Sequence, residues 1–335
     1  FFYKLTPPSA MLRSLVGSEM CIRDRFNIKQ LTKGNNMNNL KKIGLTALGT
    51  VLVTAGSAQA ASMSVSGATS IFFNGEDNSD KGNGWSMTDS ITFSASGEMD
   101  NGFTVSTSIE MDANSDADSD RSISIDTGDF GKITFSGDGS SGPIGAWDDV
   151  TPSANEEAHG TATAGTATGA TADAADENFF VFDYTAMDGL AIKASYRPSN
   201  TTSSIDSSSE FGVLYTGIDG LSVYAAMGEN NDAANSADLS NFAITYAMGA
   251  ITVGYQNNEV DFGTGTADRD FTAMGISYAV SDDLSVSYNI SEVDYEASGS
   301  ENQDAVGISF SYTSGGMTVS ATHSTIDNVC LLYTS

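Results

Sequence analysis

Eight carboxylates and no lysine or arginine lie between residues 138 and 177. They are Asp138, Asp148, Asp149, Glu156, Glu157, Asp173, Asp176 and Glu177. On the wall of a narrow water-filled channel, such a group would hold a negative potential, concentrate cations and raise the free energy of an entering anion. On an exposed loop, each carboxylate would simply be solvated. The chemistry of the segment therefore depends on the fold that positions it.

Catalysis is not expected from this chain. An acyl-transfer site needs a nucleophile and a base, and only His159 and His323 are present as histidine bases. The stretch EEAH, from Glu156 to His159, lacks the paired histidines of a zinc-protease helix. We therefore expect a protein that is not an enzyme.

A second acidic stretch, DANSDADSD from Asp112 to Asp120, is similar in composition to a calcium-binding loop. It lacks the glycine of the sharp turn and the bidentate glutamate at the end of such a loop. A solvated acidic loop is therefore the preferred interpretation. Asp116, Asp118 and Asp120 are weak candidates for binding Ca²⁺ or Mg²⁺, and no other cofactor is expected.

The charge of the chain is unevenly distributed. The formal net charge is −29 and the pI is about 4.1, yet eight of the fourteen basic residues lie before residue 61. From residue 61 onward, the chain contains six basic residues and 41 acidic ones. A surface with this charge repels nucleic acid and anionic lipid, so nucleic acid is excluded as a partner.

Residues 37–60, MNNLKKIGLTALGTVLVTAGSAQA, are typical of a secretory signal peptide. Lys41 and Lys42 precede an apolar stretch at 43–53, and an A-x-A cleavage site follows at 58–60. A transmembrane helix would need about 20 apolar residues, roughly twice the number found here. We therefore expect the protein to be exported.

Residues 1–36 and 329–335 are expected to be foreign to the protein. MLRSLVGSEMCIRDR in the first segment and VCLLYTS in the second resemble translated sequencing-adapter read-through. The exported part is then 61–328, and the natural chain is expected to continue past Asn328. Both cysteines, Cys21 and Cys330, lie in the suspect ends, so no disulfide framework is expected and extensive backbone pairing or a large core must stabilise the fold.

After residue 61, apolar residues recur with period two, and Gly, Asn and Asp separate the runs, which indicates an all-β protein. The expected strands are 62–73, 87–99, 102–112, 121–126, 131–137, 178–187, 189–197, 210–217, 220–228, 240–248, 250–259, 270–279, 284–294, 303–313 and 316–325. Tight turns alternate with longer polar loops between these strands. This asymmetry is typical of an up-and-down antiparallel outer-membrane barrel, and differs from the mixed connections of a β-sandwich or the single repeat of a solenoid.

The alternation gives each strand one apolar and one polar face. In 284–290, for example, the even positions carry Leu, Val, Tyr and Ile, whereas the odd positions carry Ser, Ser and Asn. Loop asymmetry, a signal peptide and an almost uncharged apolar face favour lipid on the apolar side and a polar lumen on the other. Such a barrel needs an even number of strands, so we expect sixteen, with fifteen present and the last one truncated. A barrel of that size leaves an aqueous channel.

The turn GDFGKITFSG, at 128–137, resembles the turn that precedes the constriction loop in general porins of Gram-negative bacteria, of the alphaproteobacterial type. It departs from that pattern at Ser136 and lacks the following arginine. The resemblance implies a trimeric, sixteen-stranded barrel at 61–328 whose third loop, 138–177, folds inward and narrows the pore. It also implies basic side chains on the wall opposite the loop acids, and Lys132, Lys193 and Arg197 have the required lumen parity.

The sequence thus predicts an outer-membrane porin that passes small hydrophilic solutes by passive diffusion and prefers cations. Its expected partners are outer-membrane lipid, lipopolysaccharide, whose phosphates Ca²⁺ or Mg²⁺ would bridge to the acidic loops, and two further copies of the chain. A substrate-specific channel is one alternative, although Tyr224 is the only clear aromatic residue with lumen parity. A secreted, calcium-binding β-rich surface protein is the other.

Overall fold

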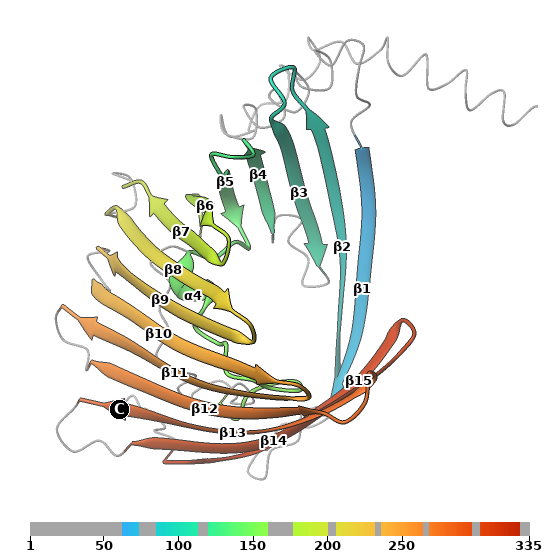
Figure 1. Cartoon of the computed structure of the whole chain (residues 1–335), viewed down its shortest axis with the longest axis vertical. Helices are drawn as coiled ribbons and strands as arrows, with labels where there is room; N and C mark the ends of the chain where they lie inside the picture. Colours follow the sequence, from blue (N-terminus) through green and yellow to red (C-terminus); the bar gives the residue numbers. More distant parts are fainter. Residues whose placement is uncertain are drawn as a thin grey trace, which may run out of the picture. The chain divides into compact units, whose positions relative to one another are not determined.

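The computed structural model describes residues 62–73, 85–112, 120–159, 177–199, 206–231, 236–263, 268–296 and 302–328. All of them belong to the second of two compact units, residues 59–335. They form one antiparallel sheet in which every strand pairs with its neighbours in the sequence (Figure 1). Its strands are β1 (Ser62–Phe73), β2 (Trp85–Glu98), β3 (Thr104–Asp112), β4 (Arg121–Asp126), β5 (Lys132–Asp138), β6 (Phe179–Met187), β7 (Leu190–Arg197), β8 (Ser208–Ile218), β9 (Leu221–Asn230), β10 (Ala237–Met248), β11 (Ile251–Phe262), β12 (Arg269–Ala279), β13 (Leu284–Tyr295), β14 (Gln303–Ser314) and β15 (Met317–Asp327).

The all-β, up-and-down prediction is confirmed, because each of the fifteen expected strands has its counterpart in the sheet. The main differences are at the polar loop ends, where β8 begins at Ser208 and β10 at Ala237, before the apolar alternation starts. Backbone pairing continues there without apolar side chains. The prediction, which relied on residue type, therefore started these two strands two or three residues too late. β1 and β15 form the two edges of the described sheet.

Glycines allow the tight turn between β4 and β5. Gly128 and Gly131 have φ angles of +71° and +91°, in the region that favours glycine. A Cβ at Gly131 would overlap the carbonyl oxygen of Asp183. The turn is closed by the N–H of Gly131, which donates to the carbonyl of Gly128 at 3.1 Å, so the motif fixes the register of the two strands.

A short helix, α4 (Pro143–Ala146), and the rest of residues 139–159 lie on the concave face of the sheet, which we call the inner face (Figure 1). Ile144 and Trp147 pack there against Leu239, Val260 and Phe271, forming the main apolar cluster. No helix of the described residues is long and apolar enough to cross a membrane.

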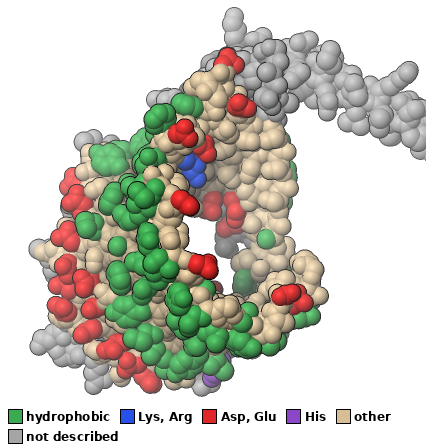
Figure 2. Space-filling view, in the orientation of Figure 1, with side chains coloured by type: hydrophobic (Ala, Val, Ile, Leu, Met, Phe, Trp, Pro, Cys, Tyr) green, Lys and Arg blue, Asp and Glu red, His purple; other side chains and the backbone are tan. Residues whose placement is uncertain are grey.

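The two faces of the sheet have the reverse of the usual polarity. On β13 and β14, Tyr288 and Ile308 are exposed on the outer face, whereas Ser287, Asn289 and Ser309 are buried on the inner face. Figure 2 shows apolar side chains gathered in a band on the outer surface, with Asp and Glu toward one end of the strands. Such a continuous apolar surface is unfavourable in water and fits lipid.

Candidate functional site: the inner wall and the loop between β5 and β6

The described part of the loop between β5 and β6 crosses the inner face from β8 to β15. Its hydrogen bonds follow the order of the strands: Ile144 N–H to Glu210 Oε2 (3.1 Å), Asn241 Nδ2 to Trp147 O (2.7 Å), Asn289 Nδ2 to Pro152 O (2.9 Å) and Asn155 Nδ2 to Thr322 Oγ1 (2.9 Å). Each bond joins a loop group to an inner-facing side chain of another strand. The predicted inward fold is therefore observed for the part of this loop that the structure describes, residues 139–159.

Glycines on the inner face provide the space in which the loop lies. A Cβ at Gly212 would overlap the Trp147 ring, and one at Gly254 or Gly275 would overlap Pro152. Gly307, on β14, faces the backbone of Ala158 in the same way. A glycine inside a strand often marks such a close approach of another backbone, so these four glycines are a signal in the sequence for the path of the loop.

Gln256 is the main polar anchor of the loop. Its side chain is fully buried, and its Nε2 donates to the carbonyl oxygens of Trp147 (3.2 Å) and Asp148. Its Oε1 accepts the N–H of Val150 at 2.9 Å. Asn258, on the same face of β11, donates to the Asp148 carbonyl at 3.0 Å. A loop backbone that would otherwise be buried without partners is thus satisfied by β11.

The aromatic residue with predicted lumen parity, Tyr224, lies on the inner face and packs against the loop. Its ring centroid is 5.9 Å from that of Trp147. The pair belongs to the apolar cluster under the loop. Tyr224 is therefore covered by the loop, which argues against a row of exposed aromatic rings at this position.

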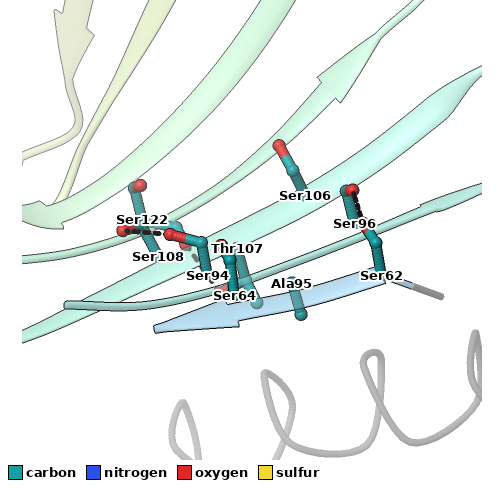
Figure 3. Close-up of a pocket in the computed structure, with 9 residues that line it drawn as sticks. All are labelled: Ser62, Ser64, Ser94, Ala95, Ser96, Ser106, Thr107, Ser108 and Ser122. Atoms are coloured by element: carbon teal, nitrogen blue, oxygen red, sulfur yellow. Dashed lines mark hydrogen bonds between the residues drawn. The ribbon is translucent and has the colours of Figure 1, made fainter. Parts of the chain in front are cut away.

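On β1 to β4, the inner face is lined with hydroxyl groups (Figure 3). Hydroxyls of neighbouring strands form rungs between Ser62 and Ser96 (2.8 Å), Ser94 and Ser108 (3.4 Å), and Ser106 and Ser124 (2.7 Å). Within the described residues of these strands the single basic residue is Arg121, which shares the outer face with Ile123 and Ile125. This part of the inner wall is thus strongly polar, and the charged side chains that share its face on β3, Glu110 and Asp112, are acidic, with Thr92 Oγ1 donating to Glu110 Oε2 at 2.9 Å.

The predicted loop acids differ in exposure. Asp149 and Glu156 are exposed, Asp148 is half-buried, and Glu157 is buried, with an exposed fraction of 8%. Asp138 ends β5 and Glu177 is exposed just before β6. Asp173 and Asp176 lie outside the described residues. The structure therefore brings together Asp148, Asp149, Glu156 and Glu157 on the segment that crosses the inner face.

The predicted wall cations are on the inner face, and two of them share one acid. Lys132 Nζ and Lys193 Nζ lie 3.6 and 3.3 Å from the two carboxylate oxygens of Asp183. Arg197 donates to Ser208 Oγ at 2.9 Å and to Asn230 Oδ1 at 3.5 Å. The two lysines thus form a cluster with Asp183 on β5, β6 and β7, while Arg197 lies at the loop end of β7.

A model of the Gram-negative porin family matches residues 44–329 of the chain. The chain belongs to this family. It is an outer-membrane porin, and small hydrophilic solutes cross it by passive diffusion. The inverted polarity of the sheet and the inward loop agree with this assignment, whereas the alternatives of a substrate-specific channel and a secreted surface protein are not favoured.

Solved porin structures share the fold. An anion-selective porin from Comamonas acidovorans is 13% identical, with a TM-score of 0.57 over 80% of this chain and 90% of that one. A loop-deletion mutant of OmpT, an outer membrane protein of Vibrio cholerae, is 18% identical, with a TM-score of 0.56 over 81% and 94%. A triple mutant of Rhodopseudomonas blastica porin is 16% identical, with a TM-score of 0.54 over 79% and 94%. A comparison with curated proteins gives no match.

The loop of this porin contains a buried carboxyl group that is not ionised at neutral pH. Burial raises the pKa of Glu157 from 4.5 to about 9, and a hydrogen bond to Asp149 adds to this shift. Burial also lowers the pKa of His159, although Asp149 opposes the effect. The His159 ring packs edge-on against Phe271 on β12, with 4.7 Å between centroids. The number of carboxyl groups on the loop therefore overstates its charge.

One inner-facing cation was missed. Arg269 shares its face of β12 with Phe271, and its guanidinium carbon lies 5.3 Å from the Phe262 ring and 5.9 Å from the Tyr295 ring. The expected strand began at residue 270, so Arg269 was assigned to the loop. Arg269, Phe271 and Ala273 are spaced two residues apart on one strand, and this spacing is the sequence signal that could have placed Arg269 on the inner face.

The weak divalent-cation candidates are only partly described. Asp116 and Asp118 lie outside the described residues, and Asp120 is exposed just before β4. Burial raises the pKa of Asp120, and Glu110, Asp138 and Asp112 add to the shift by repulsion. In the part of the chain that the structure describes, no group of three or more His, Cys, Asp or Glu side chains is arranged to hold a metal ion.

Proposed function

We propose that this porin is a cation-preferring diffusion pore narrowed by the loop at 138–177. The observation that carries the proposal is the exposure of Asp149 and Glu156 on a loop segment that β8 to β15 hold against the inner face. Fixed carboxylates in a narrow aqueous passage attract cations and raise the free energy of an anion there. Salt shortens the range of this field to about 8 Å at physiological ionic strength, so it acts where the passage is narrow.

The rest of the described wall supports this sign of selectivity. The hydroxyl rungs of β1 to β4 add no charge, and Glu110 on the same face of β3 adds a further carboxylate. Asp183 offsets part of the charge of Lys132 and Lys193. The fold alone does not set the sign, because one structural neighbour is described as anion-selective. The placement of charged side chains on the inner face must therefore decide it.

We also propose that a sixteenth strand closes the barrel. β1 and β15 occupy odd positions in an antiparallel series, so they run in the same direction. A strand of the opposite direction would pair antiparallel with both edges and satisfy their backbone groups, which is required in lipid. In this account, residues 37–60 are a signal peptide, 61–328 belong to the barrel, and 1–36 and 329–335 are foreign.

The expected assembly is a homotrimer in the outer membrane, in contact with lipopolysaccharide. On the outer face, Glu259, Asp270, Glu292 and Asp304 lie toward the loop ends of β11 to β14, beyond the apolar band. Divalent cations would be needed to bridge these carboxylates to lipid phosphates, because like charges repel. No enzymatic activity and no other cofactor are expected.

The test is the zero-current potential of planar bilayers across a tenfold KCl gradient. The protein would be residues 61–328 followed by a final strand. We expect the sign of K⁺ permeation, and we expect Asp149→Asn combined with Glu156→Gln to reduce the potential. A potential of the opposite sign, from protein shown to be folded, would reject the cation preference.

A further inference from the structure

Two carboxyl groups tie the outgoing and returning limbs of the loop together. The outgoing limb is fixed to β11 at Val150, through Gln256. The loop then reaches β15, where the N–H of Glu156 donates to Thr322 Oγ1 at 3.3 Å, and returns so that His159 packs on Phe271 of β12. Asp149 lies on the outgoing limb, next to Val150, and Glu157 lies at the start of the returning limb, just after the contact with β15. Their side chains are hydrogen-bonded.

We propose that Asp149 and Glu157 share one proton at neutral pH and act as a single titratable element that sets the ion selectivity of the pore. The inference rests on the proposed cation preference and names the residues that control it. An ionised carboxylate can only accept hydrogen bonds, so a bond between two carboxyl groups requires a proton on one of them. Glu157 is buried, which disfavours its charged form and assigns the shared proton to Glu157.

The barrel groups that contact the loop beside this pair are uncharged. They are Gln256 of β11, Phe271 of β12, Ser287 and Asn289 of β13, Gly307 and Ser309 of β14, and Thr322 of β15. On the loop itself, the neighbouring charged or titratable groups are Asp148, Glu156, which raises the pKa of Glu157, and His159. On the same face of β12, Arg269 is the other charged group, and its guanidinium lies near the Phe262 and Tyr295 rings. Among the described residues, no lysine or arginine contacts the pair, so the shared proton is what relieves the repulsion between the two carboxyl groups.

The shared proton has two consequences for conduction. At neutral pH the pair carries one negative charge, so Asp149 and Glu156 supply the field at this part of the loop. When Glu157 loses its proton near pH 9, the local charge grows and the two limbs repel each other. Cation preference should therefore increase in alkaline solution.

The experiment compares zero-current potentials across a KCl gradient at pH 7 and pH 10 for wild type, Glu157→Gln and Glu156→Gln. The amide of a glutamine at 157 can still donate to Asp149, whereas Glu156 is an exposed neighbour and the matched control. At pH 7 we expect Glu156→Gln to reduce the potential more than Glu157→Gln does. From pH 7 to pH 10 we expect a rise in wild type and in Glu156→Gln, and none in Glu157→Gln.

Two results would overturn the shared proton. One is an equal loss of potential at pH 7 in Glu156→Gln and Glu157→Gln, and the other is an alkaline rise that persists in Glu157→Gln. Asp149→Asn provides a second variant, which should lower the pH at which the rise occurs, because the neighbouring charge is gone. A wild-type channel with no K⁺ preference at either pH would instead reject the proposed function itself.

Discussion

The Oε1 of Gln256 accepts the N–H of Val150 at 2.9 Å, although 106 positions of the sequence separate the two residues. The same side chain donates to the carbonyls of Trp147 and Asp148. A single buried amide on β11 thus bonds three backbone groups of the loop, at residues 147, 148 and 150. The position of residues 147–150 should therefore depend strongly on this side chain.

Replacing Gln256 with leucine should release the loop. The variant leaves buried backbone groups without partners, at a cost of about 1–3 kcal/mol in the free energy of unfolding. We expect larger and noisier single-channel currents, measured in planar bilayers, and a lower urea midpoint. Thr252→Val, on the same face of β11, is the control. Unchanged currents in Gln256→Leu would show that other contacts suffice.

Filling the groove beneath the returning limb should also displace the loop. At Gly307 an added Cβ would lie 2.9 Å from Ala158 Cα, so Gly307→Val must move one of the two backbones, at a cost of about 1–3 kcal/mol. Gly316→Ala, where an added Cβ meets nothing within 4 Å, is the control. We expect altered conductance in Gly307→Val alone. Equal conductance in both variants would contradict the observed path of residues 155–158.

The faces of the strands could be predicted from the sequence because, within each strand, apolar residues alternate with polar ones according to whether the side chain faces lipid or water. On β13 and β14 the apolar alternation places Tyr288 and Ile308 outward, and the sheet confirms this. The strands also form neighbouring pairs, so local turns determine most of the topology. The inward position of the loop at 138–177 was expected from the resemblance of the turn at 128–137 to that of porins, and its charge alone did not indicate it.

The anchoring of that loop was not predictable in the same way. The bonds between Val150 and Gln256, and between Ala154 and Ser287, join residues more than one hundred positions apart. Their side chains are ordinary polar residues at inner-facing positions, and nothing local marks the partner. Glu157 is a similar case, because only the fold shows that it is buried against Asp149.

The stability of the protein should depend on pH through Glu157. Its pKa rises from 4.5 to about 9 on folding, so between these values the folded protein retains a proton that the unfolded chain has lost. The contribution of Glu157 to the free energy of unfolding therefore falls as pH rises through this range. We expect Glu157→Gln to lose this part of the pH dependence, measured by urea unfolding at several pH values. An identical pH dependence in the variant would argue that Glu157 is ionised in the folded state.

The lysine cluster should oppose cation selectivity once its acid is neutralised. Asp183→Asn leaves Lys132 and Lys193 without the carboxylate that lies 3.6 and 3.3 Å from their amino groups. We expect a smaller K⁺ potential in this variant and recovery when both lysines are also changed to glutamine. No change in Asp183→Asn would place the cluster outside the part of the pore that controls selectivity.

A charge on the outer face should impair insertion, whereas a charge on the inner face should not. Ile308 is 57% exposed in the apolar band, and Lys at a mid-membrane position costs about 2–4 kcal/mol in a barrel. We expect Ile308→Lys to reduce folding into lipid vesicles, measured by heat-modifiable gel migration. Ser311→Lys, on the inner face of the same strand, should fold like wild type. Equal folding of the two variants would contradict the assignment of the faces.

The most direct test of the account is the accessibility of a cysteine at position 156 in the conducting pore. Residues 61–328 contain no native cysteine, so Glu156→Cys provides one reactive site. Cationic and anionic thiosulfonate reagents would be added while single-channel current is recorded, with Ile308→Cys as the outer-face control. We predict that both reagents reduce the current of Glu156→Cys, that the cationic one reacts faster, and that Ile308→Cys does not respond. Current that is insensitive to both reagents, or a faster anionic reaction, would contradict an acidic loop inside a cation-preferring pore.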